Sequence, residues 1–489
     1  MAHTLQEIDA VIAQGPFHPT WSELATNTVP AWWAHAKFGI FSHWGVFTVP
    51  EFGSEWYSRN MYIQGSAPFK HHVATYGPQD KFGYKDFIPL FTAKEFDADK
   101  WLDLIQGSGA QYYMPVAEHH DGFQLYKSTL SRYNSVEMGP HRDVIGELRQ
   151  ATLARGLHFT LSNHRAEHWF FMSHGREFPS DIHGDLKCGD FYWPAMPEPK
   201  DHFDTRSQPY PTQEYLEDWL LRNCELVDNY QPELVYFDWW IQHEAFKPYL
   251  LKFAAYYYDR AAEWGKQVSI CYKNQAMAWG SGIKEMERGG FNTAQPFHWQ
   301  TDTAIARNSW SYTTTLDYKE APEILCTLID TVSNNGNLLL NFGPKADGSI
   351  ADKDRQILTA IGAWLKANGA GIYGSFPWEK SAEGPTQAAS GAFSDSKAQV
   401  YTPEDFRFTS KDGAIYAYQL APGERTEAVV KTFAAMPAGH EDEGYNGIIK
   451  HVEQLGVGDV PFTRDEAGLH IAGQTVADGV PRGFKIISE

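Results

Sequence analysis

The run Leu234-Val235-Tyr236-Phe237-Asp238-Trp239-Trp240 passes from four apolar residues to a carboxylate set among aromatic rings. A short apolar run of this kind indicates a buried strand, and helical patterns at 214–230 and 246–264 flank it. Strands that alternate with helices favour a parallel sheet. An unpaired carboxylate beside indole rings costs solvation free energy, so it tends to be kept for chemistry. We therefore predict that Asp238 is a catalytic nucleophile; the alternative is an aspartate that caps the next segment or pairs with an arginine.

The same alternation extends in both directions and predicts an α/β fold, a (β/α)8-type barrel with its chemistry where the strands end. An open doubly wound sheet is the alternative, but no glycine-rich phosphate turn follows the first strand. Clear strands are expected at 38–41, 112–116, 158–162, 234–238, 268–272 and 338–342, weaker ones near Met286 and Trp310, and further helices at 97–107, 142–155, 321–332 and 352–367.

A chain of 489 residues exceeds what one hydrophobic core organises, so two domains are expected. We assign residues 1–375 to the catalytic barrel and 376–489 to a C-terminal β-sandwich with a linker. The linker is the Gly-, Ser- and Ala-rich stretch 382–397, and short alternating runs at 414–419, 427–433 and 483–487 predict the sandwich strands. The long aromatic and proline-rich segment 173–211 is expected to be a lid or wall over the barrel mouth.

Composition narrows the classes of partner. A formal net charge of −20 argues against nucleic acid and anionic membrane surfaces, and no apolar run is long enough to span a bilayer. The 17 Trp and 25 Tyr suit a surface that stacks on sugar rings. The four cysteines are widely spaced, which indicates neither a zinc cluster nor a disulfide framework. Residues 1–15 read as a short amphipathic helix, so we expect a cytoplasmic protein, or a periplasmic one if a leader was removed.

Polar and aromatic side chains gather where the predicted strands end. The first strand leads to His43-Trp44 and then Glu55-Trp56, and the second leads to His119-His120. Later strands end at Asn163-His164, at Asp238, at Lys273 and at Glu287. Acids for catalysis, His and Lys for hydroxyl groups and Trp for an apolar ring face together predict a sugar pocket. Each residue taken alone could instead be structural.

Several separated blocks of the sequence resemble one known family. They are 35–45 (HAKFGIFSHWG), 53–57 (GSEWY), 118–123 (EHHDGF) and 334–341 (NNGNLLLN), and they look like the signature blocks of α-L-fucosidases of glycoside hydrolase family 29. The resemblance spans roughly residues 30–375 and is looser for the C-terminal part. It implies a retaining exo-glycosidase that removes terminal α-L-fucose from oligosaccharides or glycosides, with no metal and no cofactor.

The resemblance also assigns residues. Asp238 occupies the nucleophile position, and the blocks that line the fucose pocket contain His43, Glu55, Trp56, His119 and His120. The remaining residues expected to bind substrate are Trp44, Asn163, Trp240, Lys273 and Trp299.

The general acid/base position drifts among members of that family. Many carry a late Trp-Glu pair, but the matching pair here is Trp299-Gln300, and an amide has no proton to give at neutral pH. Glu287 and Glu55 therefore remain as candidates, and Glu287 is favoured. If Glu287 instead pairs with Arg288 or a lysine, it would be held ionised and useless as an acid.

Three alternatives to the fucosidase stay open. A carbohydrate-binding pseudoenzyme is suggested by the Trp299-Gln300 departure, and a glycosidase acting on a related sugar such as α-L-galactose would share the same blocks. A metal-dependent barrel hydrolase would use His119, His120 and His164. The sequence leaves the linkage, the aglycone and the oligomeric state open, a homo-oligomer included.

Overall fold

The computed structural model describes residues 4–388, 390–396, 398–436, 444–477 and 479–489. Eight parallel strand positions close into a barrel, which confirms the predicted fold class, because β1 pairs with both β2 and β9. The third position is split into two short pieces, β3 and β4. The barrel strands are β1 (Phe38–Ser42), β2 (Tyr112–Glu118), β3 (His158–Phe159), β4 (Leu161–Asn163), β5 (Leu234–Phe237), β6 (Ser269–Tyr272), β7 (Ile283–Glu285), β8 (Trp299–Ala304) and β9 (Gly336–Phe342).

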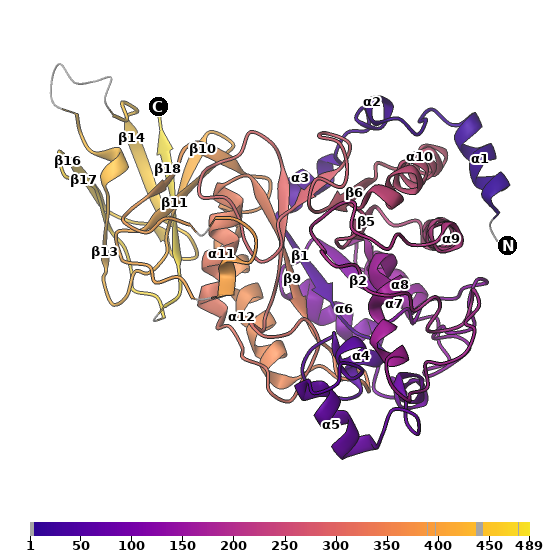
Figure 1. Cartoon of the computed structure of the whole chain (residues 1–489). Helices are drawn as coiled ribbons and strands as arrows, with labels where there is room; N and C mark the ends of the chain where they lie inside the picture. Colours follow the sequence, from indigo (N-terminus) through magenta and orange to yellow (C-terminus); the bar gives the residue numbers. More distant parts are fainter. Residues whose placement is uncertain (1–3, 389, 397, 437–443, 478) are drawn as a thin grey trace.

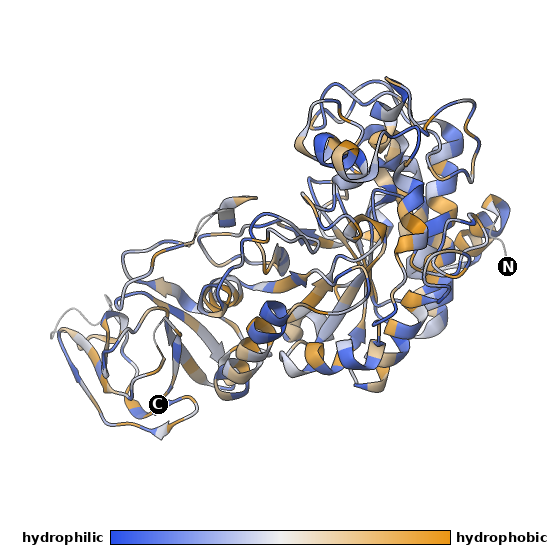
Figure 2. Ribbon diagram, turned by 90° about the horizontal axis from the view of Figure 1, so that it is seen from below, coloured by the Kyte–Doolittle hydropathy of each residue, from blue (hydrophilic) through white to orange (hydrophobic). Residues whose placement is uncertain are grey.

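The helices cover the outside of the barrel, and Figure 1 shows α1, α9 and α10 side by side on the edge away from the C-terminal sheets. Figure 2 shows them in mixed orange and blue, as expected for helices with one apolar face. No helix among the described residues combines the length and the apolar character needed to cross a membrane. The helices are α1 (Leu5–Gln14), α2 (Trp21–Leu24), α3 (Ala31–Ala36), α4 (Tyr57–Asn60), α5 (Ala67–Tyr76), α6 (Ala98–Gly107), α7 (Val144–Ala154), α8 (His168–Phe171), α9 (Gln213–Tyr230), α10 (Lys247–Trp264), α11 (Ala321–Ser333) and α12 (Asp352–Asn368).

Short 3-10 helices lie between these elements. One of them, η4, opens the segment 173–211, which is otherwise irregular up to the start of α9. They are η1 (Val46–Thr48), η2 (Tyr84–Leu90), η3 (Arg165–Glu167), η4 (Ser173–Arg176), η5 (Glu244–Phe246), η6 (Gly369–Gly371), η7 (Ser394–Ser396) and η8 (Lys431–Phe433). The N-terminal helix predicted at 1–15 is present from Leu5, while residues 1–3 of that prediction lie outside the described part.

The strand predicted near Trp310 is wrong. The seventh barrel strand is β8, at Trp299–Ala304, and Trp310 lies in the loop that follows it. The misplacement has a physical cause, because β8 carries polar side chains that point into a fully buried barrel, whereas the aromatic run near Trp310 only looks like a strand. Residues 273–298, all of which are described, contain one short strand and no helix, so the βα alternation is interrupted there.

Two antiparallel sheets follow the barrel and pack face to face as the predicted sandwich. Their core contains Phe406, Phe408, Phe433 and Phe484. The larger sheet has the order β10 (Phe376–Glu383), β11 (Phe406–Lys411), β12 (Ala414–Gln419), β18 (Arg482–Ser488), β14 (Ile449–Gln454) and β15 (Gly458–Asp459); the smaller has β13 (Glu427–Val430), β17 (Gly468–Ala472) and β16 (Phe462–Asp465). The predicted linker 382–397 begins at the end of β10, and its residues 389 and 397 lie outside the described part.

Candidate active site

A cavity of about 210 Å³ lies at the carboxyl ends of the barrel strands. Ligand pockets for drug-sized molecules span roughly 300–1,000 Å³, so this cavity suits a single sugar ring better than a larger ligand. Side chains from residues far apart in the chain meet there because parallel strands end on the same rim. Its lining is His43, Glu55, Trp56, His119, His120, His164, Tyr236, Asp238, Trp239, Lys273, Glu287, Asp302, Trp310 and Phe393.

Asp238 follows β5 directly, and each of its oxygens accepts two contacts. Oδ1 lies 3.0 Å from Lys273 Nζ and 2.9 Å from the backbone nitrogen of Trp239. Oδ2 lies 3.1 Å from His164 Nδ1 and 3.3 Å from His120 Nε2. Burial raises the pKa of Asp238, but the Lys273 ammonium and the two imidazole hydrogen bonds outweigh it and hold that pKa well below the usual range. Asp238 is therefore a half-buried carboxylate that is ionised at neutral pH.

Glu287 shares its cation with Asp238. Lys273 Nζ lies 2.6 Å from Glu287 Oε2 and 3.7 Å from Asp302 Oδ2. Burial raises the pKa of Glu287 to about 7; Lys273 lowers it, while the charges of Asp302 and Asp238 raise it further. The ion pair with a lysine, which would have argued against Glu287 as the acid, is therefore present. It does not keep the Glu287 carboxyl fully ionised at neutral pH. Arg288 turns away, with its guanidinium 4.5 Å from the centroid of the Trp310 ring.

Glu55, the other acid candidate, is fixed to the loop after β8. Its Oε2 accepts the backbone N–H of Trp310 at 2.9 Å and the Ser309 hydroxyl at 3.3 Å. Asn341 holds the same loop by donating to the carbonyl oxygen of Trp310 at 2.7 Å. Glu55 is therefore built into the pocket wall beside Trp310, without a contact to the cation that joins Asp238 and Glu287.

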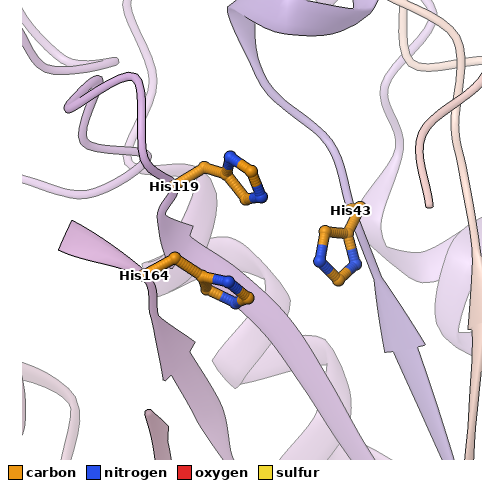
Figure 3. A group of neighbouring side chains, drawn as sticks. All are labelled: His43, His119 and His164. Carbon is orange, nitrogen blue, oxygen red and sulfur yellow. The ribbon is translucent and has the colours of Figure 1, made fainter. Parts of the chain in front are cut away.

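Four histidines line the pocket, and Figure 3 shows the rings of His43, His119 and His164 turned toward one another. Because an ionised carboxylate only accepts, His164 donates from Nδ1 to Asp238, and its Nε2 accepts from Ser162 Oγ at 3.0 Å. The pKa of His164 is lowered by burial, in keeping with this neutral form.

His120, unlike the neutral His164, carries a proton on both ring nitrogens. Its Nδ1 lies 2.7 Å from the carbonyl oxygen of His164 and 3.3 Å from Glu167 Oε2, while its Nε2 faces Asp238. Burial lowers its pKa, but the charges of Glu167 and Asp238 overcome that effect and raise it. With acceptors at both nitrogens, His120 is held as an imidazolium.

These contacts bear on metal binding. His43, His119 and His164 could each offer one nitrogen, and a second possible set is one nitrogen each from His120 and His164 with a carboxylate oxygen of Asp238. His164 has both nitrogens engaged and His120 has two donors, so neither has a free lone pair in this arrangement. His43 donates from Nδ1 to Asn341 at 2.7 Å and keeps Nε2 free, and His119 Nδ1 has no hydrogen-bond partner. Both histidines line the cavity, and the metal-dependent alternative loses two of its three proposed ligands.

Four residues expected to bind substrate do not line the cavity. Trp44 donates to the carbonyl oxygen of Lys345 at 2.7 Å and packs among Phe91, Phe96 and Trp101. Trp240 adopts a left-handed backbone at φ 79° and packs on Trp169 and Phe170. Trp299 donates to the carbonyl oxygen of Asn334, and Asn163 accepts the backbone N–H of Arg165. Each contributes to packing or to loop shape instead.

Several lining residues were not among those singled out from the sequence to bind substrate: His164, Tyr236, Trp239, Asp302, Trp310 and Phe393. His164 follows β4 directly and Trp239 is the second residue after β5, so position alone could have found them. Asp302 is a carboxylate inside β8, where the Tyr236 hydroxyl donates to its Oδ2 at 2.8 Å. Phe393 comes from beyond residue 375 and carries no sequence signal.

Position 300 lies in the barrel interior and not in the cavity. Gln300 donates from Nε2 to Glu285 Oε2 at 2.9 Å, and its Oε1 accepts the Tyr112 hydroxyl at 2.6 Å and the Trp33 indole N–H at 3.2 Å. A residue held on all sides by the core does not reach a bound sugar. The glutamine at position 300, where many family members carry a glutamate, therefore removes no acid from the pocket. The observation that suggested a pseudoenzyme no longer supports one.

Known proteins match most of the chain. A family model described as Alpha-L-fucosidase matches residues 4–370. The chain is 33% identical to plasma alpha-L-fucosidase of Homo sapiens over 384 residues, which cover 74% of this chain and 73% of the relative. It is 32% identical to an alpha-L-fucosidase of Branchiostoma floridae over 426 residues, which cover 83% and 82%. A crystal structure of Thermotoga maritima alpha-fucosidase in complex with fucose superposes with a TM-score of 0.72 at 27% identity, over 96% of this chain and 100% of that one.

Proposed function

Since the chain belongs to the α-L-fucosidase family of glycoside hydrolases, we propose that it releases terminal α-L-fucose with retention of configuration, through a covalent glycosyl-enzyme on Asp238. The observation that carries this proposal is the single ammonium of Lys273, which lies 3.0 Å from Asp238 and 2.6 Å from Glu287. Because both oxygens contact the same nitrogen, Asp238 Oδ1 and Glu287 Oε2 lie no farther apart than the sum of these two distances. Inverting enzymes separate their carboxyl groups by roughly 6.5–9.5 Å, whereas retaining enzymes hold them at about 5–5.5 Å.

The protonation states fit the two steps of a retaining reaction. Asp238 is ionised and attacks the anomeric carbon, while Glu287, with a pKa of about 7, is protonated in a large share of the molecules and gives its proton to the departing oxygen. Once Asp238 is esterified its charge is gone, so the pKa of Glu287 falls. Glu287 then accepts a proton from the water that hydrolyses the intermediate. His43, His119 and Trp56 line the space for the bound sugar, the imidazoles as polar groups and Trp56 as an apolar ring face.

The nucleophile is tested with Asp238→Gly and 4-nitrophenyl α-L-fucoside. We expect hydrolysis to fall to background, because the substitution removes the group that attacks the anomeric carbon. Azide should restore turnover by entering the space of the missing side chain, and the product should be a fucosyl azide of inverted configuration. Asp121→Asn is the matched control, since Asp121 is buried and accepts the Tyr84 hydroxyl without lining the cavity. Full activity of Asp238→Gly would contradict the assignment of Asp238 as the nucleophile.

The proton donor is tested by comparing Glu287→Gln with Glu55→Gln. A general acid contributes about 10²–10⁴-fold, and only where the leaving group needs a proton. We expect Glu287→Gln to lose activity on fucosylated oligosaccharides and to keep it on 2,4-dinitrophenyl α-L-fucoside, and Glu55→Gln to weaken both substrates alike. If the leaving-group dependence belongs to Glu55→Gln instead, the two roles are exchanged. No hydrolysis of any α-L-fucoside by the wild type would contradict the proposed function itself.

A further inference from the structure

Phe393 reaches the cavity from outside the barrel sequence. Among the described residues that line the cavity, it alone comes from beyond residue 375, from the segment between β10 and β11. Its side chain is 59% exposed, so a large apolar ring stands open to solvent at the edge of a sugar-sized pocket. Exposed rings at such a place are surfaces on which sugar or aryl rings stack.

The backbone around Phe393 is joined to the backbone around Glu287. The N–H of Phe393 donates to the carbonyl oxygen of Glu287 at 2.9 Å, and the N–H of Asp395 donates to that of Arg288 at 3.0 Å. Gly391 and Gly290 exchange hydrogen bonds in both directions. This approach is close enough that a Cβ on Gly289 would lie 1.8 Å from the carbonyl oxygen of Gly391. The segment is thus bonded to the chain that carries the proton donor.

The side chain of Asp395 fixes the same segment to the barrel. It accepts from Lys319 Nζ at 2.5 Å and from the Thr303 hydroxyl on β8. Arg288 Nη1 lies 3.8 Å away from the same carboxylate. Two residues before this anchor, Phe393 adopts a left-handed backbone at φ 56°, a conformation that costs free energy for a bulky residue and is held here by the bonds on either side. The hydrogen bonds on either side of Phe393 therefore fix the position of its backbone beside the cavity.

We propose that Phe393 forms the leaving-group side of the active site, where the ring of a sugar or of an aryl aglycone stacks on its exposed face. The inference rests on the proposed function and deepens it. A general acid faces the glycosidic oxygen, so a residue bonded to the backbone of Glu287 and lining the same cavity stands beside the group that departs. Phe393 is then a specificity-determining residue for the neutral ring attached to fucose.

The test compares leaving groups with and without a ring in wild type and Phe393→Ala. α-L-Fucosyl fluoride has a leaving group of one atom, whereas 2,4-dinitrophenyl α-L-fucoside has a ring that departs without a proton. We expect Phe393→Ala to lower kcat/KM about tenfold for the dinitrophenyl substrate and for a fucosylated disaccharide, a change that corresponds to about 1.4 kcal/mol. The fluoride and the inhibition constant of free L-fucose should stay within about twofold.

Two further variants make the result specific to the ring. Phe393→Tyr keeps a stacking face and should retain wild-type kcat/KM on all substrates. Val400→Ala removes an 82% exposed apolar side chain from the same segment without touching the cavity, so it should change nothing.

Three outcomes would overturn the proposal. Equal losses on the fluoride and on the ring-bearing substrates would mean a general disturbance of the site. A loss on the disaccharide but not on the dinitrophenyl substrate would mean that Glu287 had been displaced, and no loss on any substrate would mean that the ring is idle. Wild type that hydrolyses no α-L-fucoside is a separate result, because it removes the proposed function before the variants are compared.

Discussion

At the scale of single residues, the site depends on one cation that serves three carboxyl groups. Lys273 contacts Asp238, Glu287 and Asp302. Burial lowers the pKa of Lys273, but these carboxylates outweigh it and raise that pKa well above the usual value, so the ammonium stays charged. Burial and the charges of Asp302 and Asp238 outweigh the effect of Lys273 on Glu287, whose pKa of about 7 makes it the group that takes up a proton near neutrality.

The pH dependence of kcat/KM follows from these charges. Activity needs Asp238 ionised and Glu287 protonated, so the acid limb should lie below pH 4 and the basic limb near pH 7, with activity lost as the pH rises through that value. Removing the cation in Lys273→Met should move both limbs upward, because Lys273 lowers the pKa of both carboxyl groups. It should also cost about 10²–10³-fold in rate, as for other buried electrostatic partners of a reacting group. Rates measured from pH 3 to pH 9 check both shifts.

The control for this profile is Lys345→Met. Lys345 lies 5.1 Å over the Tyr312 ring and does not line the cavity, so its removal should leave both limbs in place. A basic limb that stays near pH 7 in Lys273→Met would show that Glu287 does not set it.

At the scale of elements, the barrel depends on the close approach of α6 and α12. A Cβ on Gly362 of α12 would lie 1.9 Å from the carbonyl oxygen of Gly107, the last residue of α6. Backbone cannot retreat from such a contact without moving a whole helix, so the glycine is required by packing and not by helix propensity.

We therefore expect Gly362→Ala to destabilise the protein by roughly 1–3 kcal/mol, the usual cost of overpacking, although alanine is the better helix former. Gly107→Ala on the facing helix is the matched control, since nothing lies within 4 Å of the Cβ it would add. Denaturant unfolding of the two variants beside wild type gives the comparison. Equal stability of Gly362→Ala and wild type would show that the helices separate freely.

Elements were predictable from the sequence where burial and periodicity agree. The strand that precedes Asp238 and the strands that precede His43 and His119 are apolar and end at polar residues, so both strand and site residue could be placed. Prediction failed where a buried strand is polar, as in β8, whose Gln300 and Asp302 hydrogen-bond to residues distant in sequence. It also failed among tryptophans, because Trp239 faces the cavity while its neighbour Trp240 packs behind it, and only three-dimensional packing decides between them.

At the scale of the whole molecule, the barrel core extends into the sandwich, which also has a core of its own. Tyr416, Tyr418 and Leu420 of the sandwich belong to the same buried cluster as Trp364 and Leu365 of α12. Figure 1 shows α11 and α12 between the barrel strands and the C-terminal sheets. Hydrogen bonds cross the same boundary, from Trp364 Nε1 to the carbonyl oxygen of Pro481 and from the Tyr418 hydroxyl to that of Asn368, each at 2.8 Å. The segment that carries Phe393 to the active site thus joins a sandwich that packs directly on the barrel helices.

The buried ion pair between Arg407 of β11 and Asp330 of α11 offers a test of whether the barrel and the sandwich unfold together. Arg407→Met leaves the Asp330 carboxylate with the Tyr401 hydroxyl as a remaining partner, and losing one member of a buried pair costs about 3–5 kcal/mol. Calorimetry should show one unfolding transition for wild type and one at lower temperature for Arg407→Met. The double variant with Asp330→Asn should recover part of the loss, because no unpaired charge is then buried. If Arg407→Met instead splits the transition in two, with the barrel component unmoved, the sandwich is a separate unit and the shared core does not couple them.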